Sequence, residues 1–293
     1  MTRDRFVLAT DSCCDLPRSL ATELDLAVLE FPFTMDGVQH LDDLGESMPA
    51  RVFYDAMRAG SAPTTAQVPL PSYVELFSAA AEAGEPLLFL SFSSALSGTY
   101  HSALVARDSV IAKHPEADIR VVDTLLASTA QALLVMGAAR RRLGGAGIDE
   151  LETWLGENLP RVNGYFTIDT MEPLRRGGRV SEFAALAGAV LDVKPVLKID
   201  SDGELVVDRP VRGRKKSLRA LVDAFADRVT DASAETVVVA HGDAPDDAAL
   251  LERLLAERVA LGEVVTLDVG PVIGSHTGPG MVAVAFWGTE RSS

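Results

Sequence analysis

The stretch Leu88-Phe-Leu-Ser-Phe-Ser-Ser-Ala-Leu-Ser-Gly-Thr-Tyr100 decides the kind of fold that this chain adopts. Continuous apolar residues bounded by Pro86 and the serines are typical of a central strand in a parallel sheet. The segment from about Tyr100 to Lys113 has the length of a helix, and a hydroxyl-rich loop with one glycine separates the two. The stretch therefore predicts a strand, a polar loop and a helix in succession.

The polar loop has two possible roles. Unpaired backbone N–H groups at the start of the helix, joined by the hydroxyls of Ser93, Ser94, Ser97 and Thr99, would suit a carboxylate or a phosphate. Serines before a helix also act as N-caps that satisfy only the helix itself. The loop alone leaves an anion cradle and a helix cap both open.

Other apolar runs repeat this pattern along the chain. Each is followed by small or polar residues and then by a helical stretch, and the runs cover Phe6 to Thr10, Leu87 to Phe92, Ile119 to Asp123, Thr236 to His241 and Val264 to Val269. This alternation predicts an α/β fold with largely parallel sheets. Ligands bind such sheets beyond the carboxyl ends of the strands, where Asp11-Ser12, Ser93-Ser94 and Asp123-Thr124 would gather.

A change of pattern near residue 160 predicts two domains, for which a length of 293 residues is sufficient. Beyond it, Gly164 to Thr170 and Val193 to Asp200 have strand patterns, and Asp202-Gly203 marks a β-hairpin. We expect a parallel-sheet, Rossmann-like domain over residues 1–160 and an α/β domain with a mixed sheet over residues 161–293.

Two connecting regions carry further expectations. Phe31 to Pro71 is too long for a plain connector, so we expect a short helix near Pro49 to Arg58 and a functional loop at Thr64-Thr65. Threonines between two prolines usually form only a turn, which is the simpler alternative. Asp149 is expected to cap a helix that ends near Leu159.

Composition narrows the classes of partner. With 27 basic and 42 acidic residues the net charge is −15, which repels phosphate backbones and weighs against nucleic-acid binding. No stretch approaches the roughly 18 apolar residues of a membrane span, so we expect no integral membrane segment and a cytoplasmic protein. The adjacent Cys13 and Cys14 cannot build a disulfide scaffold, and packing is their more usual role.

The sequence shows no cofactor-binding motif in the structural context that such a motif requires. Gly278-Pro-Gly-Met-Val-Ala283 has the spacing of a dinucleotide fingerprint, but it precedes the expected strand Met281 to Trp287 instead of joining a strand to a helix. The histidines lack the spacing of a zinc or iron site. We expect no cofactor and no metal.

His276 and two basic clusters are candidates for chemistry. His276 lies in Gly274-Ser-His-Thr-Gly-Pro-Gly280, which we expect to be a loop; its imidazole could bond to an anion, add to a carbonyl, or merely face solvent. The clusters, usually solvated faces, are Arg175-Arg-Gly-Gly-Arg179 and a run from Arg209 to Arg219. The glycines of the first would permit close approach to an anion, and the second could form a docking surface for an acidic or phosphate-carrying partner. The apolar helix expected from Val180 to Leu191 could be fully buried, or could form one wall of an apolar slot.

Several stretches together resemble the DegV family of bacterial fatty-acid-binding proteins. They occur in order over nearly the whole chain and are Thr10-Asp-Ser12, Thr65-Ala-Gln67, Ser93 to Tyr100, Leu174 to Ser181, Leu191 to Val196 and Gly274 to Gly280. The resemblance implies two α/β domains that hold one long-chain fatty acid between them. It also implies a carrier without its own catalytic centre, which presents the acyl group to a separate ATP-dependent kinase subunit that makes acyl phosphate.

The resemblance assigns roles to particular residues. Those expected to bind the carboxylate are Thr65, Ser94, Ser97, Gly98 and His276. Those expected to line the tail are Phe166, Ile168, Phe183, Leu186 and Val190. Those expected to dock the kinase subunit are Arg176, Arg179, Arg212 and Arg214.

The sequence departs from the family pattern at two places, and two alternative functions are open. The family commonly has Thr-Ser-Gln-Pro where this chain has Thr65-Ala-Gln-Val68, so one hydroxyl is missing, and Cys13-Cys14 replaces the usual residues after Asp-Ser. The first rival is the substrate-binding subunit of a small-ketone kinase that uses His276 covalently, because the fold is related to such subunits. The second is a regulatory protein whose lipid is structural.

Overall fold

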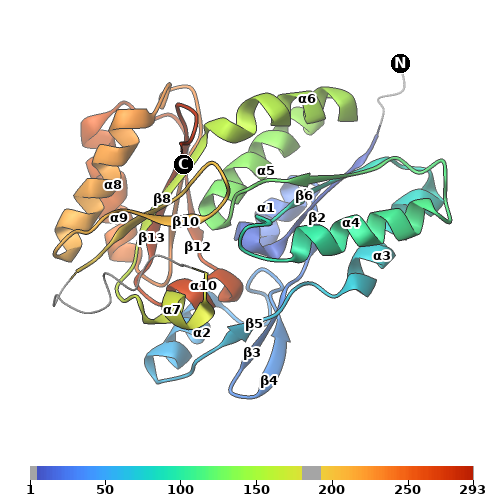
Figure 1. Ribbon diagram of the computed structural model, residues 1–293. Coiled ribbons are helices and arrows are strands. Elements are labelled where there is room, and N and C mark those ends of the chain that lie inside the picture. Colours follow the sequence, from blue (N-terminus) through green and yellow to red (C-terminus); the bar gives the residue numbers. More distant parts are fainter. Residues whose placement is uncertain (1–4, 180–192, 293) are drawn as a thin grey trace.

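The computed structural model describes residues 5–179 and 193–292, and Figure 1 shows two main sheets with helices packed around them. The first sheet is parallel throughout, with the strand order β2-β1-β6-β7. Its central strand β6 is buried along its whole length, as the apolar run predicts. The strands are β1 (Val7–Asp11), β2 (Ala27–Leu29), β6 (Leu87–Ser91) and β7 (Ile119–Asp123).

The second sheet is mixed and has the order β10-β9-β8-β13-β11-β12, in which only β11 and β12 pair in parallel. The mixed sheet expected for the second half of the chain is therefore confirmed, and so is the hairpin turn at Asp202-Gly203. The strands are β8 (Val162–Thr167), β9 (Val196–Ile199), β10 (Leu205–Arg209), β11 (Val237–His241), β12 (Val264–Asp268) and β13 (Val282–Trp287).

Helices cover both sheets, and one of them lies between the two. Helix α5 (Ser128–Leu143) is buried on most of its surface and contacts β8, β11 and β13 as well as the 3₁₀ turn η1 (Ser12–Cys14) of the first half. The outer face of the mixed sheet carries α8 (Arg214–Arg228) and α9 (Pro245–Arg258). The remaining helices of the first half are α1 (Arg18–Glu23), α3 (Leu70–Ala83), α4 (Thr99–Ile111) and α6 (Ile148–Asn158), followed by the 3₁₀ turn η2 (Leu159–Arg161). Because α5 packs on both sides, a single hydrophobic core runs from the parallel sheet to the inner face of the mixed one.

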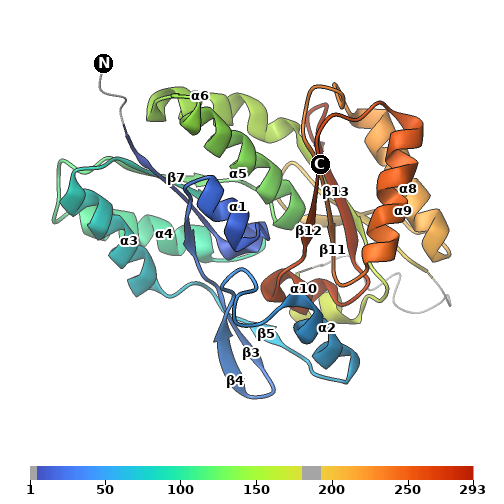
Figure 2. The same cartoon turned by 180° about the vertical axis from the view of Figure 1, so that it is seen from behind.

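A small antiparallel sheet projects from the first half, with the order β4-β3-β5. Its strands are β3 (Pro32–Met35), β4 (Val38–Leu41) and β5 (Thr64–Thr65), and the expected helix, α2 (Ala50–Arg58), lies between β4 and β5 in the chain. Figure 2 shows α2 beside α10 (Pro271–Thr277) of the second half, and these two helices are in contact. The small sheet thus brings Thr65 next to the C-terminal region.

Three local expectations were wrong. Thr64-Thr65 is not a free loop, because both residues pair with Phe33 and Thr34 of β3. His276 lies in the last turn of α10, where Pro271 starts the helix without losing a hydrogen bond. Helix α6 begins at Ile148 with Gly147 as its N-cap, so Asp149 lies inside the first turn, where its charge suits the helix dipole.

Candidate ligand-binding site

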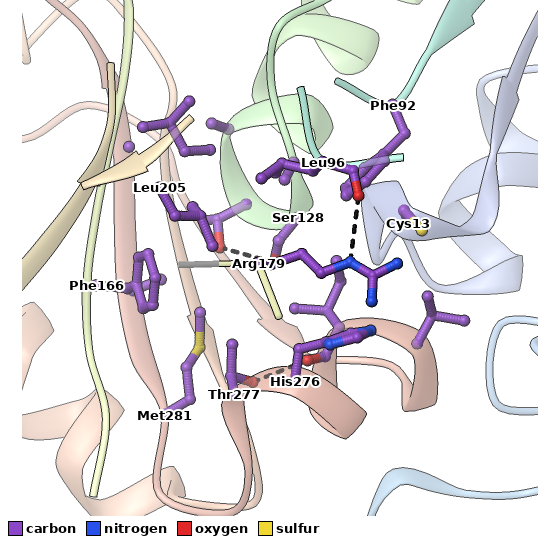
Figure 3. A pocket seen from close by; sticks show the side chains of 18 of the residues that line it. Cys13, Phe92, Leu96, Ser128, Phe166, Arg179, Leu205, His276, Thr277 and Met281 are labelled. Atoms are coloured by element: carbon purple, nitrogen blue, oxygen red, sulfur yellow. Dashed lines mark hydrogen bonds between the residues drawn. The ribbon is translucent and has the colours of Figure 1, made fainter. Parts of the chain in front are cut away.

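A cavity of about 340 Å³ lies between the two halves of the molecule, and Figure 3 shows part of its wall. Its volume falls within the usual range for small-molecule sites, and most of its wall is apolar. The wall includes β5, the loop after β6, the start of α5, strands β8, β9, β10 and β13, and helix α10. The apolar residues that line it include Phe31, Phe92, Leu96, Phe166, Leu174, Ile199, Leu205, Val272, Ile273 and Met281.

The cavity adjoins the carboxyl ends of the parallel strands, as the sequence predicts. The carboxylate of Asp11 accepts a hydrogen bond from the Phe92 amide at 2.8 Å, and that of Asp123 accepts one from the Ser94 amide at 3.1 Å. These bonds shape the loop after β6 with side chains from the two neighbouring strands. Burial raises the pKa of Asp11 to about 7.

One hydrogen bond joins the two halves at the polar end of the cavity. Thr65 Oγ1 on β5 lies 2.8 Å from His276 Nε2 on α10, although 211 positions separate them in sequence. Burial, followed by the charges of Arg179 and Arg176, lowers the pKa of His276 to about 4. The imidazole is therefore neutral at pH 7.

The surroundings of the other ring nitrogen fix the tautomer. His276 Nδ1 is buried and has no hydrogen-bond partner among the described residues. A buried N–H without an acceptor costs more than an unused lone pair, so the proton belongs on Nε2. In that tautomer His276 donates to Thr65 Oγ1, and the Thr65 hydroxyl keeps its own hydrogen for an anion in the cavity.

Gly177 makes this position of the histidine possible. A Cβ atom at position 177 would lie 2.1 Å from His276 Nδ1, well inside van der Waals contact. The glycines of the Arg175–Arg179 segment were expected to allow an anion to approach. The structure shows that Gly177 instead allows the imidazole to approach, at the end of helix α7 (Glu172–Gly177).

Residues of the polar loop from Ser93 to Thr99 have different roles: some line the cavity and others hold the structure together. Ser97 lines the cavity, and its Oγ lies 2.7 Å from Thr99 Oγ1. Ser93 donates instead to the Gly203 carbonyl at 2.9 Å, which fastens the tip of the β9–β10 hairpin to the loop. Ser94 and Gly98 are described but lie outside the cavity wall, and the missing side chain of Gly98 makes room for Gln67.

The basic residues are placed unequally. Arg179 lines the cavity beside Leu96, whose carbonyl accepts a bond from its Nε at 3.4 Å, and Figure 3 shows its side chain passing close to His276. Arg176 and Arg212 are exposed. Arg214 has a side chain only 18% exposed and bonds to Asp247 at 2.8 Å.

The expected tail residues have different places. Phe166 lines the cavity, whereas Ile168 is fully buried in the core beside it. Phe183, Leu186 and Val190 lie outside the described residues. Sequence reasoning missed Gln67, Ser128, Leu205 and Met281 as lining residues. Only Gln67 carried a signal, because it belongs to the stretch Thr65-Ala-Gln67.

The cysteines behave as packing residues. Both are free and buried, and Cys13 contributes to the cavity wall. Burial raises the pKa of each thiol, so neither is a ready nucleophile.

The described part of the chain gathers no group of three or more metal-binding side chains. Among the described residues, no helix has both the length and the apolar character needed to cross a bilayer.

Known proteins share this sequence and architecture. A DegV domain-containing protein of Clostridium perfringens is 39% identical over 287 residues, which are 98% of this chain and 99% of that protein. A structure described as a DegV lipid-binding protein from Thermotoga maritima superposes with a TM-score of 0.86 at 29% identity, covering 98% of this chain and all of that one. A structure described by the fatty-acid binding of a DegV family protein from Thermus thermophilus gives 0.85 at 29% identity, covering 97% and 99%.

A family model settles the relationship. The model described as an uncharacterised protein of the DegV family matches residues 5–288, nearly the whole chain. The match spans both sheets and every lining segment of the cavity that the structure describes. The chain belongs to the DegV family.

Proposed function

We propose that this protein binds one long-chain fatty acid in the cavity, with the carboxylate at Thr65, Ser97 and His276 and the tail along the apolar wall. The observation that carries the proposal is the Thr65–His276 pair at one end of a mostly apolar cavity. The hydroxyls of Thr65 and Ser97 can donate to a carboxylate without burying an opposite charge, and the neutral imidazole of His276 donates to Thr65 and directs the hydrogen of its hydroxyl. The relatives from Thermotoga maritima and Thermus thermophilus, described as binding lipid or fatty acid, support the same ligand class.

Affinity and orientation come from different parts of the site. Each buried methylene contributes about 0.8 kcal/mol, so a tail of a dozen or more carbons supplies most of the binding energy. A hydrogen bond to a charged group contributes roughly 1.5 to 3 kcal/mol, which is enough to fix which end of the ligand meets Thr65. A small polar ketone would gain little from such a wall, which disfavours the ketone-kinase alternative.

Extraction of the purified protein followed by mass spectrometry tests the ligand. We expect a copurifying fatty acid at close to one per protein, and binding of added fatty acid by the stripped protein on titration. Absence of both in repeated preparations would remove the proposal.

We further propose that the bound carboxylate is presented to a separate ATP-dependent kinase subunit in the cytoplasm, yielding acyl phosphate. Exposed Arg176 and Arg212 stand out against a net charge of −15, and Arg176 belongs to the segment that packs on His276. Exposed cationic side chains suit an acidic or phosphate-carrying partner.

Charge reversal separates docking from lipid binding. Arg176→Glu with Arg212→Glu is expected to lower acyl phosphate formation by a supplied kinase subunit and ATP at least tenfold, with fatty-acid affinity nearly unchanged. Arg253→Glu, at an exposed position on α9, is the matched control. Full turnover by the double variant would refute the assignment of these arginines, and failure of the unaltered protein to support turnover would refute the carrier role.

A further inference from the structure

One buried carboxyl group lies behind the cavity and bonds to two of the elements that form it. Asp15 Oδ1 accepts a hydrogen bond from the Gly270 amide at 2.8 Å, and Asp15 Oδ2 accepts one from the Ser128 hydroxyl at 2.5 Å. The residue is only 6% exposed. A single side chain of the first half thus joins the start of α5 to the start of α10.

The approach of α10 to this carboxyl group is close. A Cβ atom at position 270 would lie 3.0 Å from Asp15 Oδ1 and 3.2 Å from Asp42 Oδ2. Glycine at position 270 therefore permits the contact, and its φ of −72° shows that the need is for space rather than for an unusual backbone. The Tyr54 hydroxyl adds a second bond from the first half, to the Val269 carbonyl at 3.0 Å.

Because the start of α10 is fixed in this way, the other end of the helix, which carries His276 at the polar end of the cavity, is fixed as well. His276 lies six residues beyond Gly270, about 9 Å along the helix, and a helix this short moves as one unit. The segment after α10 is held by the second half, where the Gly280 amide donates to the Gly242 carbonyl at 2.8 Å. The position of the imidazole relative to Thr65 therefore depends on the bonds that fasten Gly270 and Val269 to the first half.

The second partner of Asp15 belongs to the cavity wall. Ser128 lines the cavity and has a φ of 50°, a left-handed conformation that is costly for a residue other than glycine. The bond from its hydroxyl to Asp15 helps to hold that conformation at the start of α5. The same carboxyl group thereby fixes a point on the wall and the helix that carries the histidine.

We propose that Asp15 is a positioning residue for ligand binding, which fixes α10 against the first half so that His276 meets Thr65 and directs its hydroxyl toward the carboxylate. This inference rests on the proposed fatty-acid function. Its consequence is specific to the headgroup: loss of Asp15 should weaken recognition of the carboxylate and leave contacts with the tail in place.

The test compares two ligands with the same tail, palmitic acid and 1-hexadecanol. Asp15→Gly removes the carboxyl group and suits the backbone, since Asp15 has a φ of 56°. Asp15→Asn keeps an acceptor for the Gly270 amide and a donor for Ser128 Oγ. We expect Asp15→Gly to lower the affinity for palmitic acid roughly tenfold and the affinity for hexadecanol less than about twofold. Asp15→Asn should keep most of the affinity for palmitic acid that Asp15→Gly loses.

Controls keep the outcome interpretable. Asp200→Gly removes another aspartate that is 6% exposed and accepts backbone amides, those of Asp202 and Glu204, in the β9–β10 turn; it should leave the acid-to-alcohol ratio unchanged. If Asp15→Gly does not fold, Asp15→Ser, with a side chain too short for both partners, takes its place. Equal losses for both ligands, or no rescue by asparagine, would overturn the positioning role. An unaltered protein that binds neither ligand would instead refute the proposed function.

Discussion

The imidazole of His276 and the hydroxyl of Thr65 form the polar pair to which we assign the orientation of the ligand. Because the histidine is neutral and donates to Thr65, its contribution is to direct the hydroxyl hydrogen rather than to supply charge. The two side chains should therefore act as a unit, and changes to either should not add.

The first prediction concerns this pair. His276→Ala and Thr65→Ala are each expected to weaken fatty-acid binding roughly 10- to 100-fold, the range for a hydrogen bond to a charged group. The affinity of the double variant should be only slightly lower than that of the single variant that binds more weakly. Titration of the stripped proteins with one fatty acid gives all four dissociation constants, and strictly additive losses would show that the residues act separately.

The second prediction concerns Gly177. A methyl group there would collide with His276 Nδ1, so Gly177→Ala should displace the imidazole and reduce affinity about as much as His276→Ala. Gly156→Ala is the control, because position 156 lies in α6 with open space around it; that change should leave binding intact and stabilise the helix by up to about 1 kcal/mol. Unaltered binding by Gly177→Ala would mean that the histidine is not needed where the structure places it.

At the scale of elements, α10 and β5 show how tertiary contacts override local signals. Glycine and proline around His276 favour a loop, yet burial against its neighbours makes residues 271–277 helical. Two threonines between prolines favour a turn, yet pairing with β3 makes them a strand. The polar pair exists because these two short elements meet.

The third prediction concerns the contact of β8 with α5. Gly164 lines the cavity, and a Cβ atom there would lie 3.0 Å from Ala130 Cβ. Gly164→Val should therefore shorten the space for the tail, and each methylene excluded should cost about 0.8 kcal/mol, or roughly fourfold in affinity. Competition among saturated acids of increasing length measures the shift. An unchanged length preference would place the end of the tail elsewhere.

At the scale of the whole molecule, the described residues of the first half include three buried acidic side chains, Asp11, Asp15 and Asp42. Burial raises the pKa of Asp11 and of Asp42 to about 7, and burial also raises that of Asp15. A carboxyl group whose pKa is higher in the folded state holds its proton more tightly there than when unfolded. For Asp11 and Asp42, this contribution to stability is full below about pH 4 and is lost as the pH rises through 7.

The fourth prediction follows from Asp42, whose Oδ2 has no hydrogen-bond partner among the described residues. Asp42→Asn cannot ionise, so it should gain stability relative to the unaltered protein between pH 5 and pH 7 at up to about 1.4 kcal/mol per pH unit. Thermal unfolding at several pH values measures this. Parallel curves for Asp42→Asn and the unaltered protein would mean that Asp42 titrates normally.

The sequence by itself determined the parallel strands, the mixed second sheet, the hairpin and the family. Apolar runs, turn residues and short motifs are local signals, because each depends on only a few consecutive residues. It also pointed to Thr65, Ser97 and His276, which line the cavity. Tertiary structure alone decided that Ser94 lies outside the cavity wall, that Arg214 bonds within the protein, and that Gln67 and Ser128 line the wall. These outcomes depend on which distant atoms meet, and spacing along a chain does not specify the distance between two halves that fold against each other.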